Sequence, residues 1–170
     1  MARRLSYSAR YTQPAEKLFQ AQMERQYWDD MMEGFRMLTP TSHVEEFSAD
    51  GDGMRVVLKQ AITRDMLPPI AKTVMAKDMM ITRVETLGTL DDAKAHGTYN
   101  ASIPAGPGSL TGKQELFGTE TGCTIRKTTE VKVFIPFVNA KIEQLMLVNI
   151  VDLFRAEAEF ATFWVDKHLG

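Results

Sequence analysis

Lys127 and Glu157 are charged residues at positions where the surrounding pattern is apolar. A helical projection of the C-terminal segment at 100° per residue puts Glu157 near the centre of an apolar arc, between Leu153 and Phe160. Lys127 lies two residues after Ile125 and four before Val131 along a predicted strand, so its side chain should point to the same side as theirs. An unpaired carboxylate among apolar side chains is costly, and Glu157 therefore needs a partner or water.

The lengths of the two segments agree with a meeting of Lys127 and Glu157. From the turn at 136–139, Lys127 lies about 8 residues back along a strand at ~3.3 Å each, and Glu157 lies about 18 residues on along a helix at ~1.5 Å each. Both paths cover roughly 27 Å. We predict a polar spot in an otherwise apolar cavity, with Gln60 and Thr129 as further members. The alternative is that Glu157 lies at an open cavity mouth while Lys127 extends to solvent.

The segment that carries Glu157 is predicted to form one helix from Val138 to Leu169. About 30 residues at 1.5 Å each span about 45 Å, which is long for a small domain. Its apolar side must be covered by the rest of the chain. That side comprises Ile142, Leu145, Met146, Ile150, Leu153, Phe154, Phe160, Ala161 and Trp164. Asn149 lies at its edge, as a satisfied core amide or as a ligand contact.

The predicted cover is an antiparallel sheet, because seven strand-like segments precede the helix. They are Arg4–Tyr11, Thr41–Ala49, Met54–Thr63, Met79–Leu87, Ala93–Ile103, Ser109–Phe117 and Cys123–Ile135. Two short helices are expected between the first two strands, with Thr12 or Gln13 as the N-cap and Pro14 in the first turn. A third, at Ile70–Met75, would cover one end of the sheet and is a candidate gate.

Helices confined to the ends of a run of strands predict an α+β fold, and the length suits a single domain over residues 1–170. The net charge is −2 and basic residues do not cluster, so nucleic acid is not an expected partner. We find no secretory signal and no transmembrane segment, and expect a soluble, cytoplasmic protein. The oligomeric state stays open.

The residues that commonly bind metals are too few and too scattered to predict a metal site. Cys123 is the only cysteine, which excludes an intramolecular disulfide and favours a small buried hydrophobe. His43, His96 and His168 lie far apart in the sequence and are expected at the surface. We predict neither a metal nor a cofactor.

Several short stretches of this sequence are distinctive: Leu67-Pro68-Pro69, Glu85-Thr86-Leu87-Gly88, Gly122-Cys123-Thr124, the segment Glu130 to Pro136, Lys141-Ile142-Glu143 and Glu157-Ala158-Glu159-Phe160. Together they resemble an actinobacterial domain-of-unknown-function family within the START-like (SRPBCC) superfamily. The resemblance implies a helix-grip fold, in which a seven-stranded antiparallel sheet wraps around a long C-terminal helix. Two positions depart from it: Leu87 stands where that family often carries tryptophan, and Lys127 stands where an apolar residue is usual.

The superfamily includes lipid and hormone carriers, cyclases and dehydratases acting on polyketide-like substrates, and chaperone regulators, so the resemblance alone does not select a function. We expect binding or carriage of an apolar small molecule, of lipid, polyketide or isoprenoid type, between the sheet and the C-terminal helix. The candidate ligand-binding residues are Gln60, Met75, Tyr99, Lys127, Thr129, Met146, Asn149, Leu153, Glu157 and Phe160. Two alternatives are a cyclase-like or dehydratase-like enzyme with Glu157 as acid or base, and a protein-interaction adaptor with a filled core.

Overall fold

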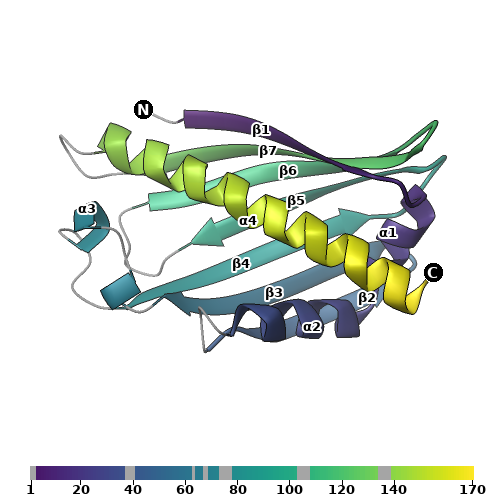
Figure 1. Ribbon diagram of the computed structural model, residues 1–170, viewed down its shortest axis with the longest axis horizontal. Helices are drawn as coiled ribbons and strands as arrows, with labels where there is room; N and C mark the ends of the chain where they lie inside the picture. The colour runs from purple at the N-terminus through teal and green to yellow at the C-terminus, as the bar shows by residue number, and fades with distance from the viewer. Residues whose placement is uncertain are drawn as a thin grey trace.

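The structure, a computed structural model, describes residues 3–36, 41–62, 64–66, 69–72, 78–102, 108–133 and 139–170. A seven-stranded antiparallel sheet forms one layer, and the long helix α4 (Asn139–His168) runs diagonally across one face of it (Figure 1). The predicted α+β helix-grip architecture is confirmed, and the long helix begins and ends within a residue of its predicted bounds.

The first and last strands of the chain are neighbours in the sheet. Its strands are β1 (Arg3–Tyr11), β2 (His43–Asp50), β3 (Gly53–Ile62), β4 (Met79–Gly88), β5 (Lys94–Ser102), β6 (Gly108–Thr119) and β7 (Gly122–Val133). They lie in the order β1-β7-β6-β5-β4-β3-β2. Because β1 pairs with β7, Tyr7 lies opposite Lys127, and both side chains face α4.

Two short helices, α1 (Ala15–Gln22) and α2 (Arg25–Phe35), follow β1 as predicted. The predicted N-cap of α1 is wrong: Pro14 occupies that position and makes no side-chain cap bond. The Gln13 amide instead donates to the carbonyl of Thr162 at 3.1 Å and to Asp166 Oδ1 at 2.9 Å, so it ties the start of α1 to the end of α4. At the opposite end of the sheet lie a 3₁₀ turn (Arg64–Met66) and α3 (Pro69–Lys72) (Figure 1).

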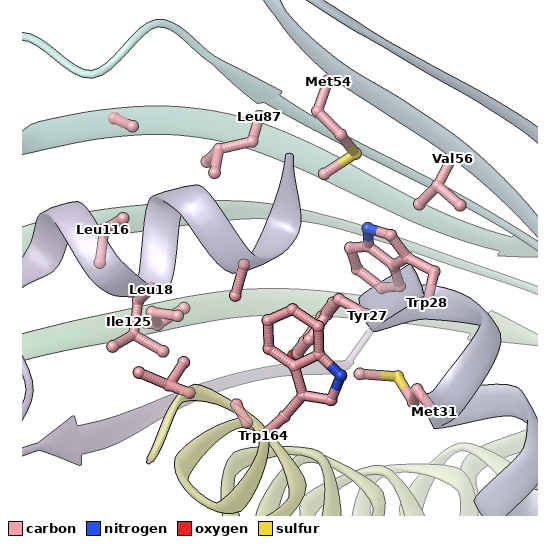
Figure 2. Close-up of a cluster of buried hydrophobic side chains, with 14 of the residues drawn as sticks. Leu18, Tyr27, Trp28, Met31, Met54, Val56, Leu87, Leu116, Ile125 and Trp164 are labelled. Atoms are coloured by element: carbon pink, nitrogen blue, oxygen red, sulfur yellow. The ribbon is translucent and has the colours of Figure 1, made fainter. Parts of the chain in front are cut away.

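The larger hydrophobic cluster fills the space between the sheet, α1, α2 and the C-terminal half of α4 (Figure 2). We call it the Trp164 cluster. Tyr27 packs edge-on against Trp28 and Trp164, with ring centroids 5.1 and 5.4 Å apart. The indole N–H groups also have partners: Trp28 donates to the Gln22 carbonyl at 3.0 Å, and Trp164 donates to Asp30 Oδ2 at 2.8 Å. This half of the grip is closely packed and its indole donors are satisfied.

A smaller cluster lies nearer the middle of α4. We call it the Tyr99 cluster: Tyr99, Leu110, Val131 and Phe154, with Leu5, Tyr7, Ala101 and Ile150 packed against them. Tyr99 is directly opposite Gly112 on the neighbouring strand, and a Cβ atom at Gly112 would overlap the Tyr99 ring. Glycine at this position therefore lets the ring lie flat against the sheet.

Candidate functional site

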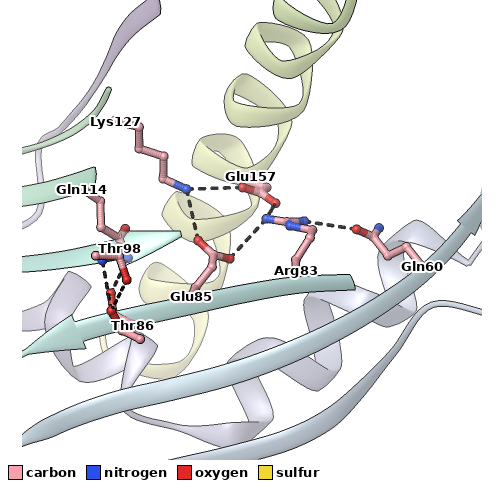
Figure 3. Close-up of polar contacts among 8 residues, drawn as sticks. All are labelled: Gln60, Arg83, Glu85, Thr86, Thr98, Gln114, Lys127 and Glu157. Atoms are coloured by element: carbon pink, nitrogen blue, oxygen red, sulfur yellow. Dashed lines mark hydrogen bonds and ion pairs between the residues drawn. The ribbon is translucent and has the colours of Figure 1, made fainter. Parts of the chain in front are cut away.

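Four charged side chains meet between the sheet and α4, and we call them the charged quartet: Arg83, Glu85, Lys127 and Glu157 (Figure 3). Arg83 and Glu85 come from β4, where they alternate with Thr86 and Val84 and so share the inner face with Leu87. Lys127 comes from β7 and Glu157 from α4. Segments 74 residues apart in sequence thus meet within hydrogen-bonding distance.

Each carboxylate of the quartet contacts both cations. Glu157 accepts from Arg83 Nη2 at 2.6 Å and lies 3.6 Å from Lys127 Nζ. Glu85 lies 3.2 Å from Arg83 Nη2 and 3.5 Å from Lys127 Nζ. Gln60 Oε1 accepts from Arg83 Nη1 at 3.2 Å. Two formal positive and two formal negative charges therefore form a closed, neutral arrangement, as buried charges require.

The partners keep Glu157 ionised although it is only 6% exposed. Burial alone would raise the pKa of Glu157, but the charges of Arg83 and Lys127, with the hydrogen bonds from them, outweigh burial and lower it. Burial pulls the pKa of Arg83 down, whereas Glu157 and Glu85 push it above its usual value. Both members of the shortest ion pair are therefore charged at neutral pH.

Lys127 is held less tightly than the other three members. Its side chain is 14% exposed, against 8% for Arg83 and Glu157 and 3% for Glu85. Its two ion pairs, at 3.5 and 3.6 Å, are longer than the best Arg83 contact. Its ammonium lies 4.6 Å from the centre of the Phe154 ring and 5.4 Å from that of Tyr99, within the range of cation–π attraction.

A small cavity of about 30 Å³ adjoins the quartet. Its lining is mixed, with Tyr7, Tyr11, Tyr27, Phe154 and Ile125 among the apolar and aromatic residues, and Gln22, Gln114, Glu85, Lys127 and Glu157 among the polar ones. This volume holds about one or two water molecules. Burial raises the pKa of both Tyr11 and Tyr27, so their hydroxyls stay protonated and can act as donors.

Two hydroxyl groups near the quartet are buried without a hydrogen-bond partner among the described residues: those of Tyr99 and Thr129. Tyr99 is 5% exposed and Thr129 is 1% exposed. Both flank Gly112, because Tyr99 pairs with it across one neighbouring strand and Thr129 across the other. Buried hydroxyls usually have a partner, so this pair needs an explanation.

The structure brings several of the sequence-predicted residues together. Lys127 and Glu157 meet, Gln60 joins them through Arg83, and Tyr99 and Thr129 lie close by on β5 and β7. Phe160 lies elsewhere: its ring packs against Tyr27 at 5.5 Å, on the edge of the Trp164 cluster. Their role in ligand binding stays a prediction.

Of the other four predicted residues, the structure describes the side chain of Leu153. Leu153 is half-buried on α4. Met146 and Asn149 also lie on α4, but their side chains are outside the described part of the structure, and Met75 is outside the described residues altogether.

Sequence reasoning missed Arg83 and Glu85. A signal was present, because Arg83 and Glu85 fall on the same face of a strand as Ile81 and Leu87, which are apolar. Two adjacent inward charges in one strand would have supplied the partner that Glu157 requires.

The other candidates for chemistry are less informative. Cys123 is fully buried, and burial raises the pKa of its thiol to about 11, as expected for an unreactive core residue. His43, His96 and His168 are exposed. In the described part of the chain, no three His, Cys, Asp or Glu side chains are grouped as a metal site would require. None of the described helices is long and apolar enough to cross a membrane.

Comparison with known sequences identifies the family. Residues 6–165 match the model of DUF2505, described as a protein of unknown function. Uncharacterized proteins of Mycobacterium tuberculosis and Mycobacterium bovis are 26% identical over 176 residues, covering 99% of this chain and 100% of the relatives. The predicted resemblance to a domain-of-unknown-function family is thereby confirmed.

Comparison with solved structures supports the same fold. Ara h 8.0201 superimposes with a TM-score of 0.61 at 12% identity, covering 99% of this chain and 100% of that one. Zhui aromatase/cyclase from Streptomyces sp. R1128 gives 0.56 at 12% identity, covering 100% and 97%. Norcoclaurine synthase from Thalictrum flavum gives 0.56 at 14% identity, covering 99% and 88%. At such identities the likeness establishes the fold alone.

Proposed function

We propose that this chain, which belongs to the DUF2505 family of proteins of unknown function, binds and carries an apolar small molecule between the sheet and α4. The observation that carries the proposal is the pair of buried, unpartnered hydroxyls on Tyr99 and Thr129. An unmade hydrogen bond of a buried group costs about 1–3 kcal/mol. A bound molecule with one polar end would satisfy both groups.

The surroundings of these hydroxyls suit an apolar molecule. The Tyr99 cluster supplies Leu110, Val131 and Phe154, with Tyr7 and Ile150 at its margin. Small-molecule sites in proteins have this composition, mostly apolar walls with a few convergent polar groups. In this proposal the body of the ligand lies against the Tyr99 cluster, between β5–β7 and the part of α4 that carries Met146, Asn149 and Leu153.

Entry of a ligand requires this region to open. The cavity of about 30 Å³ beside the quartet is far smaller than the ~300–1,000 Å³ of typical small-molecule sites. We therefore assign that cavity to the polar end of the site, and expect the side chains of the Tyr99 cluster to move apart when the apolar body enters. We also propose that the segment Ile70–Met75, the predicted gate, admits the ligand. Helix α3, which includes the first residues of this segment, lies at one end of the sheet.

The fold supports a small-molecule role in general terms. A second structure of norcoclaurine synthase, which superimposes with a TM-score of 0.54, is a complex with dopamine and hydroxybenzaldehyde. Zhui is an aromatase/cyclase by name. These activities belong to those proteins, and they support only the idea that a helix-grip fold can hold small organic molecules.

Acid–base catalysis by Glu157 is the weaker proposal. A general acid must carry its proton near neutral pH, but Arg83 and Lys127 lower the pKa of Glu157. A strong ion pair at 2.6 Å also occupies the oxygen that would take up a proton. Glu157 is therefore better suited to hold its partners in place.

An adaptor role has limited support. The exposed large apolar side chains among the described residues are Phe163 and Met80, on α4 and β4 respectively. Met80 lies on the outer face of the sheet, away from α4, so the two do not form one patch. A protein-binding surface normally requires a contiguous apolar area of several hundred Å².

The test is native mass spectrometry of the protein purified from its own host, compared with the denatured protein. A defined added mass that is released on denaturation is expected. The matched variants are Ala101→Phe, which fills the Tyr99 cluster, and Ala156→Phe, which makes the same change at an exposed position of α4. The added mass should disappear in the first and persist in the second. An apo mass for the wild type, together with no binding of any added apolar probe, would contradict the proposal.

A further inference from the structure

We propose that the ligand is an uncharged molecule whose polar end is a hydrogen-bond acceptor, such as a ketone, ester or quinone oxygen, bound by the ammonium of Lys127. This inference rests on the proposed function and narrows its substrate class. It excludes fatty acids and other carboxylates, as well as amines, from the preferred ligands.

The first step is the hydrogen-bonding capacity of Lys127. An ammonium group has three N–H donors. Two point toward Glu85 and Glu157, at the long distances of 3.5 and 3.6 Å, and the flanking Phe154 and Tyr99 rings accept no conventional hydrogen bond. Within the described residues the third donor is available, and Lys127 also lines the small cavity. An acceptor oxygen can bind there without displacing either carboxylate.

The second step is charge balance, which disfavours an anion. The quartet is already neutral, with two cations and two carboxylates. A ligand carboxylate at Lys127 would be the third carboxylate around a single ammonium, beside Glu85 and Glu157. In a buried site such like-charge contacts cost far more than in water. A neutral carbonyl gains a charge-assisted hydrogen bond without this repulsion.

The same balance disfavours a cation. Glu85 and Glu157 are the acidic groups that could attract one, but each already contacts both Arg83 and Lys127. A ligand ammonium would have to approach those two cations, and the carboxylates have no unshared charge to offer. The site thus discriminates against both signs of charge.

The third step concerns the unpartnered hydroxyls. Tyr99 and Thr129 are not among the residues that line the small cavity, so their hydroxyls would donate to a further oxygen of the ligand, because a small molecule can carry several acceptor oxygens. Burial raises the pKa of Tyr99, so its proton is retained at neutral pH. With the third N–H of Lys127, these hydroxyls offer three donors, whereas Gln22 Oε1 is the unpartnered side-chain carbonyl among the described residues that line the cavity.

The test compares four probes with the same apolar body: naphthalene, 2-acetylnaphthalene, 2-naphthoate and 2-(aminomethyl)naphthalene. Dissociation constants at pH 7 are measured by calorimetry or by quenching of tryptophan fluorescence. We expect the ketone to bind about tenfold or more tightly than naphthalene, as for one hydrogen bond to a charged group. The naphthoate and the amine should bind more weakly than naphthalene.

Variants identify the group responsible. Lys127→Met alone leaves a net negative charge in the quartet, so the informative variant is the double change Lys127→Met with Glu157→Gln, which keeps the site neutral. In this variant the ketone and naphthalene should bind with equal affinity. Lys113→Met, on the outer face of the neighbouring strand β6, is the matched control and should keep the tenfold preference. Tyr99→Phe and Thr129→Val should each reduce the preference by a smaller factor.

The possible results separate this inference from the proposed function. If none of the four probes binds, the proposed function fails. If naphthalene and the ketone bind the wild type equally, or the naphthoate binds most tightly, the inference about ligand class is wrong while the proposed function stands. A preference for the ketone that persists in the double variant would show that another group is the donor, and would also overturn the inference.

Discussion

The two halves of the space under α4 differ in whether the polar groups of their aromatic rings have hydrogen-bond partners. In the Trp164 cluster, aromatic rings contact one another edge-on and both indole N–H groups have acceptors. In the Tyr99 cluster and at the adjoining Thr129, two hydroxyls are buried without a partner among the described residues, and the loosely held ammonium of Lys127 lies over the Tyr99 and Phe154 rings. On the Trp164 side, the side-chain oxygens of Gln13 and Gln22 are also buried without a partner among the described residues. Both halves are covered by one helix and one sheet.

This difference separates stability from function. A closely packed region lowers the free energy of the folded chain and leaves little space for a ligand. A region with unmade hydrogen bonds gives up stability, and such sacrifices are common at functional sites. The first half should therefore respond to mutation mainly through stability, and the second mainly through binding.

The largest expected effect is on the packed half. Trp164→Ala should lower the free energy of unfolding by about 3–5 kcal/mol, because it removes a fully buried aromatic side chain and leaves a cavity. Urea unfolding followed by circular dichroism measures this. Selectivity among the naphthalene probes should not change in whatever fraction stays folded. A loss below 1 kcal/mol would mean that this half is not closely packed.

A smaller loss is expected when one charge of the quartet is removed. Glu157→Gln keeps the side-chain shape but leaves Arg83 and Lys127 with one carboxylate between them, and should cost about 2–3 kcal/mol. The matched control, Glu159→Gln, changes an exposed residue on the same helix and should stay within about 0.5 kcal/mol. Equal losses of unfolding free energy in the two variants would mean that Glu157 is exposed to solvent. That result would contradict the contrast between the two halves of the space under α4.

The pH dependence of stability should identify the charge of Glu157 as the cause. Its pKa is lowered in the folded protein relative to the ordinary value of 4.5. Its contribution is therefore complete above that value and is lost as the pH falls through the folded-state pKa. The difference in unfolding free energy between wild type and Glu157→Gln should be constant near neutral pH and shrink below pH 4.5. A difference that grows on acidification would have the wrong sign.

The smallest effect concerns the unpartnered hydroxyl of Tyr99. Tyr99→Phe should leave the ligand-free protein as stable as the wild type or stabilise it by up to about 1 kcal/mol, because it removes a buried group without a partner. Thermal unfolding of ligand-free samples is the measurement. A clear loss of stability would indicate that the hydroxyl already has a bonding partner, and would remove the main support for a ligand in this half.

Periodicity was sufficient to predict the strands, the long helix and the α+β class. The strict alternation in β1 and the long apolar arc of α4 each depend on local geometry that a single sequence displays. The distance argument for Lys127 and Glu157 also holds, because a strand and a helix leaving one turn have fixed rises per residue. In the structure, Lys127 Nζ lies 3.6 Å from Glu157 Oε2.

What could not be predicted depends on contacts across the sheet. Arg83 reaches Gln60, Glu85 and Glu157 on three different elements, and the shape of that network follows from strand order, which periodicity does not specify. Phe160, also on the apolar arc of α4, is a predicted ligand-binding residue, and that role stays a prediction. The arc is wide enough for one edge to face α2, and Phe160 packs there against Tyr27.

The most direct test of the central claim is a crystal structure of the protein with 2-acetylnaphthalene. The account predicts the naphthalene rings against the Tyr99 cluster, the carbonyl oxygen within hydrogen-bonding distance of Lys127 Nζ, and the four ion pairs of the quartet intact. Rings bound outside the space between the sheet and α4, or a carbonyl directed away from Lys127, would contradict it.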